Sequence, residues 1–221
     1  MNIMTERYRV ILIGELGVGK SSILNQFING NFNPNYRTCI SSQFFTKTIY
    51  LPENKNVTID LWDTTEQEKY HSLPTIYYKN ANVVILVYDI TKKYTFDEAK
   101  NYWYEQIKQN HEDNNIIIIL VANKNDLYED QKVLNEERKE FAKNIGAIFI
   151  STSAKNNNDI NFLFENIAMK ILNPNFDYTS FDRKAMDEFR NNIKKERNEN
   201  DKTNNKIINL NIPKEKKKNN C

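Results

Sequence analysis

The sequence predicts a doubly wound α/β domain over residues 5–173. This is a P-loop fold with a six-stranded, mostly parallel sheet, one antiparallel strand, and helices on both faces. From residue 8 onward, apolar strand-like runs alternate with amphipathic helix-like segments. Two of those runs, residues 83–88 and 116–122, are apolar on both faces, as expected for central strands covered by helices on both sides. A glycine-rich loop between the first strand and the first helix completes the pattern, and ligands of such folds bind at the carboxyl ends of the strands.

Six segments have the alternation and length of strands: residues 8–14, 44–51, 57–62, 83–89, 116–123 and 147–151. Residues 52–56 join the second and third segments and are rich in turn formers, which predicts an antiparallel hairpin. Helical segments separate the other strands, as in parallel α/β sheets.

The helices are predicted from their caps and apolar stripes. Residues 95–98, Thr-Phe-Asp-Glu, form a capping-box pattern and predict a helix that runs to about Gln109. Asn135 is the predicted N-cap of the next helix. An apolar stripe over residues 160–171 predicts the last helix, which Pro174 ends.

Composition and charge restrict the class of protein. Hydrophobic residues make up 39% of the chain and charged residues 27%, which is typical of a globular protein. The only cysteines, Cys39 and Cys221, cannot form a disulfide framework, which favours a reducing compartment. Residues 176–221 carry 12 basic and 8 acidic side chains, whereas the preceding residues carry 19 basic and 21 acidic ones. A near-neutral body argues against nucleic acid as a partner, since nucleic-acid-binding domains concentrate basic residues on one face.

Residues 14–21 read Gly-Glu-Leu-Gly-Val-Gly-Lys-Ser and hold three of the five glycines in the chain. Such a cluster indicates a tight bend or a close approach of the backbone. Between a strand and a helix, the pattern predicts a loop whose N–H groups bind phosphates, with Lys20 at the β/γ-phosphates and the Ser21 hydroxyl on Mg²⁺. The predicted phosphate-binding residues are Leu16, Gly17, Val18, Gly19, Lys20, Ser21 and Ser22. The alternative is a structural turn that matches by chance.

Three further motifs follow at predicted strand ends. Asp63 ends the third strand, where its carboxylate would hold Mg²⁺ from the side opposite Ser21; alone, it would be an ordinary strand-end acid. Residues 123–126, Asn-Lys-Asn-Asp, end in a carboxylate that accepts from both N1–H and the 2-amino group of guanine, a donor pair that adenine lacks. Residues 151–155 follow the last strand, where a backbone N–H can meet the base oxygen.

In this order, the motifs resemble those of the Rab family of Ras-superfamily small GTPases, over about residues 5–173. Further matches lie at residues 62–63, 67–68, 77–78 and 88–91 and at Phe96. Residues 70–73 and 27–32 look closest to the early-endosomal branch. The resemblance implies a switch in vesicle or endosomal membrane traffic that binds GTP or GDP with Mg²⁺. Its implied partners are an exchange factor, an activating protein and effectors of Rab type.

The resemblance also implies residue roles. Gln67 matches the glutamine that orients the attacking water, to which an activating protein adds an arginine. The implied guanine-binding residues are Asn123, Lys124, Asp126, Ser153, Ala154 and Lys155. The implied effector-facing aromatic residues are Phe44, Trp62 and Tyr77, for which ordinary packing is the alternative.

Three positions depart from the family pattern, and all are expected near the γ-phosphate. Leu16 replaces a small residue and would crowd Gln67. Cys39 aligns with the switch threonine that offers Mg²⁺ its hydroxyl; a thiol is a poor ligand for Mg²⁺, and Thr38 would replace it only after a local shift. Glu66 replaces the glycine whose N–H turns to the γ-phosphate. These departures predict slow hydrolysis and a weakened switch, or alternatively a pseudo-GTPase scaffold that binds nucleotide structurally.

Residues 174–221 form a polar, Lys- and Asn-rich segment that predicts a flexible basic tail. A lysine cluster at 214–218 precedes Cys221, and a basic cluster with one prenyl group is a two-signal membrane anchor. The expected location is cytoplasmic, peripheral on the cytosolic face of endosomal or vesicle membranes. The alternative is an unmodified cysteine on a disordered tail.

Overall fold

The computed structural model describes residues 6–34, 43–63, 78–111 and 116–176, together with residues 186 and 191. All but the last two belong to one compact unit, Met1–Thr179. Several predicted site residues lie outside the described residues: Thr38, Cys39, Glu66, Gln67, Tyr77 and Cys221.

Within the described ranges, six strands form one sheet in the order β2-β3-β1-β4-β5-β6. The strands are β1 Arg7–Ile13, β2 Gln43–Tyr50, β3 Asn56–Asp63, β4 Val83–Asp89, β5 Ile117–Asn123 and β6 Ile148–Ser151. β2 pairs antiparallel with β3, and the other neighbours pair in parallel. The predicted six-stranded, mostly parallel sheet is therefore confirmed, with every strand end within about one residue of its expected position.

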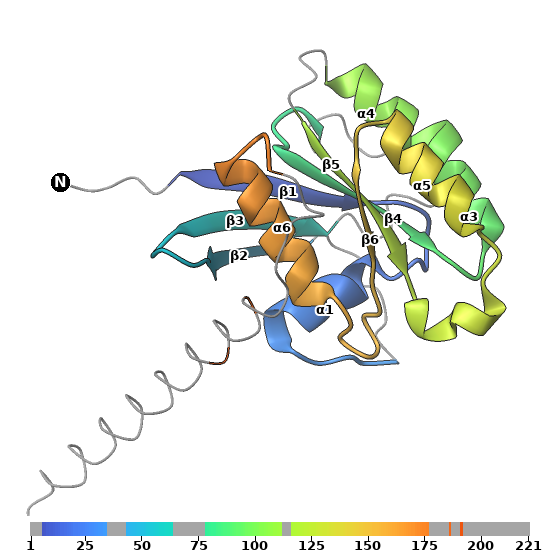
Figure 1. The fold of residues 1–221 in the computed structure, drawn as a ribbon, viewed down its shortest axis with the longest axis horizontal. Coiled ribbons are helices and arrows are strands. Elements are labelled where there is room, and N and C mark those ends of the chain that lie inside the picture. The colour runs from blue at the N-terminus through green and yellow to red at the C-terminus, as the bar shows by residue number, and fades with distance from the viewer. Residues whose placement is uncertain are drawn as a thin grey trace, which may run out of the picture. The chain divides into compact units, whose positions relative to one another are not determined.

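Helices cover the sheet on both sides (Figure 1). α1 (Lys20–Asn29) packs against α6 (Ile160–Leu172), and both helices contact β3. The other group is α3 Lys93–Glu98, a π-helical segment Ala99–Trp103, α4 Tyr104–Asn110 and α5 Asn135–Asn144. A 3₁₀ segment, Asn125–Asp130, follows β5. Each helix in the described ranges is too short or too polar to cross a membrane.

Two predicted helix starts are wrong. α3 begins at Lys93, and the Thr95 hydroxyl does not cap it. Instead, the Thr95 hydroxyl accepts from the Asp89 backbone N–H at 3.1 Å and donates to the Lys92 carbonyl at 2.7 Å. The side chain therefore ties the helix to the end of β4. Asn135 is the first residue of α5 rather than its N-cap, because the Leu134 carbonyl accepts the first helical hydrogen bond, from the Arg138 N–H at 3.2 Å.

The core lies around the central strands. Every residue of β4 is buried, as are the last five residues of β5, so the two-sided apolar pattern is confirmed. Aromatic side chains fill the space between β4 and the α3–α4 helices, where Phe96 lies edge-to-face with Tyr88 at 4.9 Å between ring centroids. Because each fully buried large side chain stabilises the fold by about 1.5–3 kcal/mol, this packing fixes the strand ends from which the site is built.

Candidate functional site

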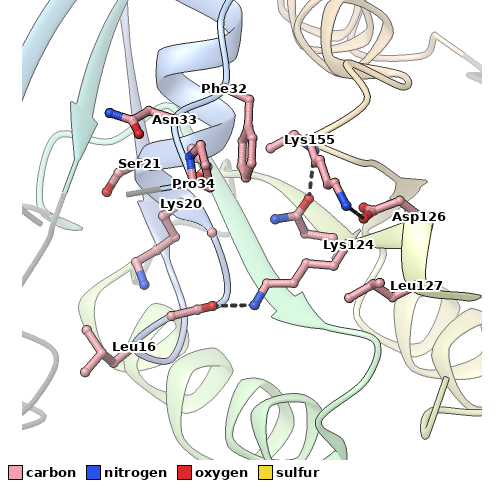
Figure 2. Close-up of a pocket in the computed structure, with 15 residues that line it drawn as sticks. Leu16, Lys20, Ser21, Phe32, Asn33, Pro34, Lys124, Asp126, Leu127 and Lys155 are labelled. Carbon is pink, nitrogen blue, oxygen red and sulfur yellow. Dashed lines mark hydrogen bonds and ion pairs between the residues drawn. The ribbon is translucent and has the colours of Figure 1, made fainter. Parts of the chain in front are cut away.

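A cavity of about 370 Å³ lies where the chain leaves the carboxyl ends of β1 and β5 (Figure 2). β1 is the strand from which the sheet grows in both directions, with β3 on one side and β4 on the other, and ligands of doubly wound sheets bind at such switch points. The cavity is lined by Leu16, Gly17, Gly19, Lys20, Ser21, Ser22, Phe32, Asn33, Pro34, Asn123, Lys124, Asp126, Leu127, Ala154 and Lys155. The structure thus brings the glycine loop, residues 123–126 and residues 154–155 to one site.

The glycine loop needs its glycines for two different reasons. Gly14 and Gly19 have φ values of 139° and 102°, which other residues rarely adopt. A Cβ on Gly14 would lie 2.1 Å from the Val87 carbonyl oxygen, and one on Gly19 would lie 2.3 Å from Nδ2 of Asn123. The loop is therefore bent and also pressed against the β4 and β5 strand ends.

Lys20 is the first residue of α1 and is buried. Its Nζ donates to the carbonyl oxygens of Gly14 at 2.9 Å and Glu15 at 2.8 Å. The loop thus wraps around its own lysine, next to the positive end of the helix. A buried cation and a helix N-terminus together form a site for an anion such as phosphate.

Ser21 and Asp63 place two oxygen donors beside that cation. The Asp63 carboxylate is buried and accepts a hydrogen bond from Ser21. Burial raises the pKa of Asp63, although the Ser21 hydrogen bond and the Lys20 charge act against this shift. Among the described residues, Asp63 Oδ1 has no hydrogen-bond partner. A hydroxyl and an uncommitted carboxylate oxygen fit a hard divalent cation such as Mg²⁺.

Asn123 joins three loops of the site. Its Nδ2 donates to the Val18 carbonyl at 2.8 Å. Its Oδ1 accepts from the Thr152 hydroxyl at 3.1 Å and from the Ala154 N–H at 3.4 Å. Asn123 lines the cavity, but its amide is used to hold the surrounding loops in place.

Lys124 crosses the cavity floor to the glycine loop (Figure 2). Its Nζ donates to the Gly17 carbonyl at 2.8 Å and forms a 2.7 Å ion pair with Asp89 Oδ2. Burial of Asp89 opposes its ionisation, but the Lys124 and Thr91 hydrogen bonds outweigh it and lower the pKa of Asp89. Asp89 was not among the predicted site residues, although its position at a strand end, like that of Asp63, was a signal for it.

Asp126 presents its carboxylate at the cavity wall. Oδ1 accepts from the Ser153 hydroxyl at 2.6 Å, and Oδ2 lies 3.9 Å from Lys155 Nζ. Ser153 is fully buried and does not line the cavity; it sets the orientation of Asp126 from behind. A carboxylate fixed in this way can accept two parallel N–H donors from a planar base.

The comparisons with known proteins agree with this geometry. Residues 9–173 match the Ras family. The chain belongs to the Ras family. It is 40% identical over 163 residues to the Ras-related protein Rab-22A of Homo sapiens, a match that covers 74% of this chain and 82% of that protein. It is 39% identical over 166 residues to the Ras-related protein Rab11A of Lotus japonicus, covering 75% and 72%, respectively. The predicted Rab assignment is confirmed.

Two of the aromatic residues that Rab proteins are expected to present to effectors are described. Phe44 in β2 is 49% exposed, and its ring lies 5.0 Å from that of Trp62 in an edge-to-face arrangement. The guanidinium carbon of Arg9 lies 5.1 Å from the centroid of the Trp62 ring. Phe44 is therefore a half-exposed surface side chain, whereas Trp62 is partly buried against the core.

The Rab-type cavity also has lining residues that no motif predicted. Phe32, Asn33 and Pro34 follow α1 and close one side, and Leu127 lies beyond Asp126. These residue types are not characteristic of nucleotide sites, so only the structure shows that they line the cavity. Leu16 was predicted to stand at the phosphate end, and it lines the cavity while 40% exposed.

Proposed function

We propose that this Rab-family chain is a guanine-nucleotide-binding switch in vesicle or endosomal membrane traffic, which binds GTP or GDP with Mg²⁺ and hydrolyses GTP slowly. The observation that carries the proposal is a single cavity with a buried cation, Lys20, at one end and an oriented carboxylate, Asp126, at the other. The first end suits a diphosphate, and the second suits the N1–H and 2-amino donors of guanine.

The test is to purify the protein and identify the bound nucleotide, then to compare binding of GDP and ATP by calorimetry. We expect GDP to bind at least about a thousandfold more tightly than ATP, because adenine would leave the Asp126 carboxylate without its donor pair. Equal binding of the two nucleotides would contradict the proposal.

Ser21 and Asp63 would hold Mg²⁺, which supplies charge neutralisation at the phosphates. Because the Asp63→Asn variant keeps the shape but loses the charge, we expect it to need about ten to a hundred times more Mg²⁺ to slow GDP release. The measurement is the GDP dissociation rate against Mg²⁺ concentration. With the chelator EDTA present, variant and wild type should release GDP at similar rates; a difference there would mean that Asp63 acts without the metal.

Slow hydrolysis is proposed because Leu16 stands at the phosphate end of the cavity, where it would crowd the predicted Gln67. We expect Leu16→Ala to accelerate single-turnover GTP hydrolysis by about tenfold, since small misplacements of a reacting group cost this much or more. Leu127→Ala is the matched control, because Leu127 lines the same cavity and is 39% exposed but lies at the base end. Equal rates for wild type and Leu16→Ala would remove Leu16 as the cause.

A pseudo-GTPase scaffold is the second candidate, and the exposed bulk of Leu16 favours it. The further departures, Cys39 and Glu66, lie outside the described residues. Single-turnover hydrolysis separates the two candidates. A switch converts bound GTP to GDP and changes its effector affinity, whereas a scaffold keeps GTP and binds partners equally in both states.

The membrane and its proteins are the proposed partners. The basic segment before Cys221 would bind an anionic membrane surface, and a prenyl group on Cys221 would add the second signal. Similarity to Rab-22A and Rab11A supports an endosomal or vesicle membrane, on its cytosolic face. Phe44 and Trp62, with Tyr77, would contact effectors, while an exchange factor and an activating protein would act at the nucleotide.

A further inference from the structure

The helix that follows β4 contains a π-helical segment, Ala99–Trp103, between α3 and α4. Its mark is the hydrogen bond from the Tyr104 N–H to the Ala99 carbonyl, which spans five residues instead of four. Such segments are rare and frequently lie at functional sites, because the extra residue turns the side chains that follow in a new direction. This segment ends at Trp103.

Trp103 connects that helix to the phosphate loop. Its side chain is fully buried, and the indole Nε1 donates to Glu15 Oε1 at 3.0 Å. Glu15 is the second residue of the loop, and its own carbonyl accepts from Lys20 Nζ at 2.8 Å. One residue therefore carries both contacts: the indole holds its side chain, and the phosphate-binding lysine holds its backbone.

The direction of the Glu15 carboxylate matters because it is a negative charge at a site for phosphate. Leu16 and Gly17 line the cavity, but Glu15 does not. Its charge acts on the helix side instead: together with burial, it raises the pKa of Tyr102, the neighbour of Trp103. The indole thus meets the carboxylate on the side away from the cavity.

We propose that Trp103 is a positioning residue for diphosphate binding, which holds the phosphate loop through Glu15 and keeps the Glu15 carboxylate turned away from the phosphates. This inference rests on the proposed guanine-nucleotide binding. Because the contact reaches Lys20, it concerns the β-phosphate, which GDP has and GMP lacks.

Trp103→Phe keeps an aromatic ring and removes the N–H donor. We expect its dissociation constant for GDP to rise about tenfold, as for loss of a hydrogen bond to a charged group, while that for GMP changes less than about twofold. Both constants are measured by calorimetry. Tyr104→Phe is the matched control, since it removes a polar group from the next position, where the ring packs on Phe141, and should bind both nucleotides like wild type.

Glu15 provides an independent test if Trp103→Phe does not fold. Glu15→Ala removes the acceptor together with its negative charge, so we expect a selective loss of GDP affinity that is smaller than that of Trp103→Phe. The double variant should match Glu15→Ala, because Trp103 has no carboxylate left to hold. Glu15→Gln retains an oxygen acceptor and should restore GDP binding to at least the wild-type level. In a Trp62→Phe background, the fluorescence of Trp103 should change in Glu15→Ala but not in Glu15→Gln.

Three results would overturn the inference: wild-type GDP affinity in Trp103→Phe or Glu15→Ala, equal losses of GDP and GMP affinity, or additive losses in the double variant. Wild-type protein is measured first. If it binds no guanine nucleotide, the proposed function fails together with this inference; if it binds GDP and the variants match it, only this inference fails.

Discussion

Asp126→Asn is expected to lower the affinity for GDP by about a thousandfold and to make xanthosine diphosphate the preferred ligand. The Ser153 hydroxyl lies 2.6 Å from Asp126 Oδ1 and would keep an oxygen at that position. The amide NH₂ introduced by the substitution would then face the base. A donor there opposes the 2-amino group of guanine, whereas it matches the carbonyl oxygen that xanthine carries at the same position.

Competition calorimetry with both diphosphates measures this change of preference. Asp130→Asn is the matched control, because Asp130 lies on the same 3₁₀ segment but is exposed and does not line the cavity. It should leave both affinities unchanged. If Asp126→Asn still preferred GDP, the base would be recognised by other groups, and the guanine assignment of this end of the cavity would be wrong.

The sequence predicted those parts of the fold that depend on local pattern. Alternation and two-sided apolar runs located the six strands of the described ranges, and the glycine loop located the end of the cavity at which we propose that phosphates bind. The pattern at residues 95–98 predicted the wrong helix start, because the Thr95 hydroxyl bonds the end of β4 instead of capping the helix. Helix propensity takes no account of such a tertiary contact. Similarly, the role of Asn123 depends on contacts with distant segments, because its side-chain amide bonds the Val18 carbonyl and the Thr152 hydroxyl.

Contacts between distant segments could not be predicted from the sequence. The Lys124–Asp89 ion pair and the Trp103–Glu15 hydrogen bond join residues on different elements, and no spacing rule relates them. The ion pair follows from the order of the parallel strands, which brings the ends of β4 and β5 to one edge. The hydrogen bond depends on how the helix after β4 packs beside the glycine loop. The motifs therefore predicted the side chains that would contact a nucleotide. The structure was needed to identify the residues that orient those side chains.

Gly14→Ala is expected to have the largest effect on stability, lowering the free energy of unfolding by about 4 kcal/mol. Two costs combine: a φ of 139° that L side chains rarely adopt, and a Cβ placed 2.1 Å from the Val87 carbonyl oxygen. The carbonyl belongs to the fully buried strand β4 and cannot move aside as a flexible side chain would. Urea unfolding of the nucleotide-free protein measures the change, because bound ligand would add its own stabilisation.

Gly17→Ala separates the two costs. Gly17 also has a positive φ, 79°, but a Cβ there would meet no atom within 4 Å. This variant should lose only the conformational part, about 1–2 kcal/mol. If both variants lost the same amount, the contact with β4 would contribute nothing, and the loop would need its glycines for backbone conformation alone. A larger loss for Gly14→Ala would mean that the close approach to the sheet is what fixes the conformation of the glycine loop.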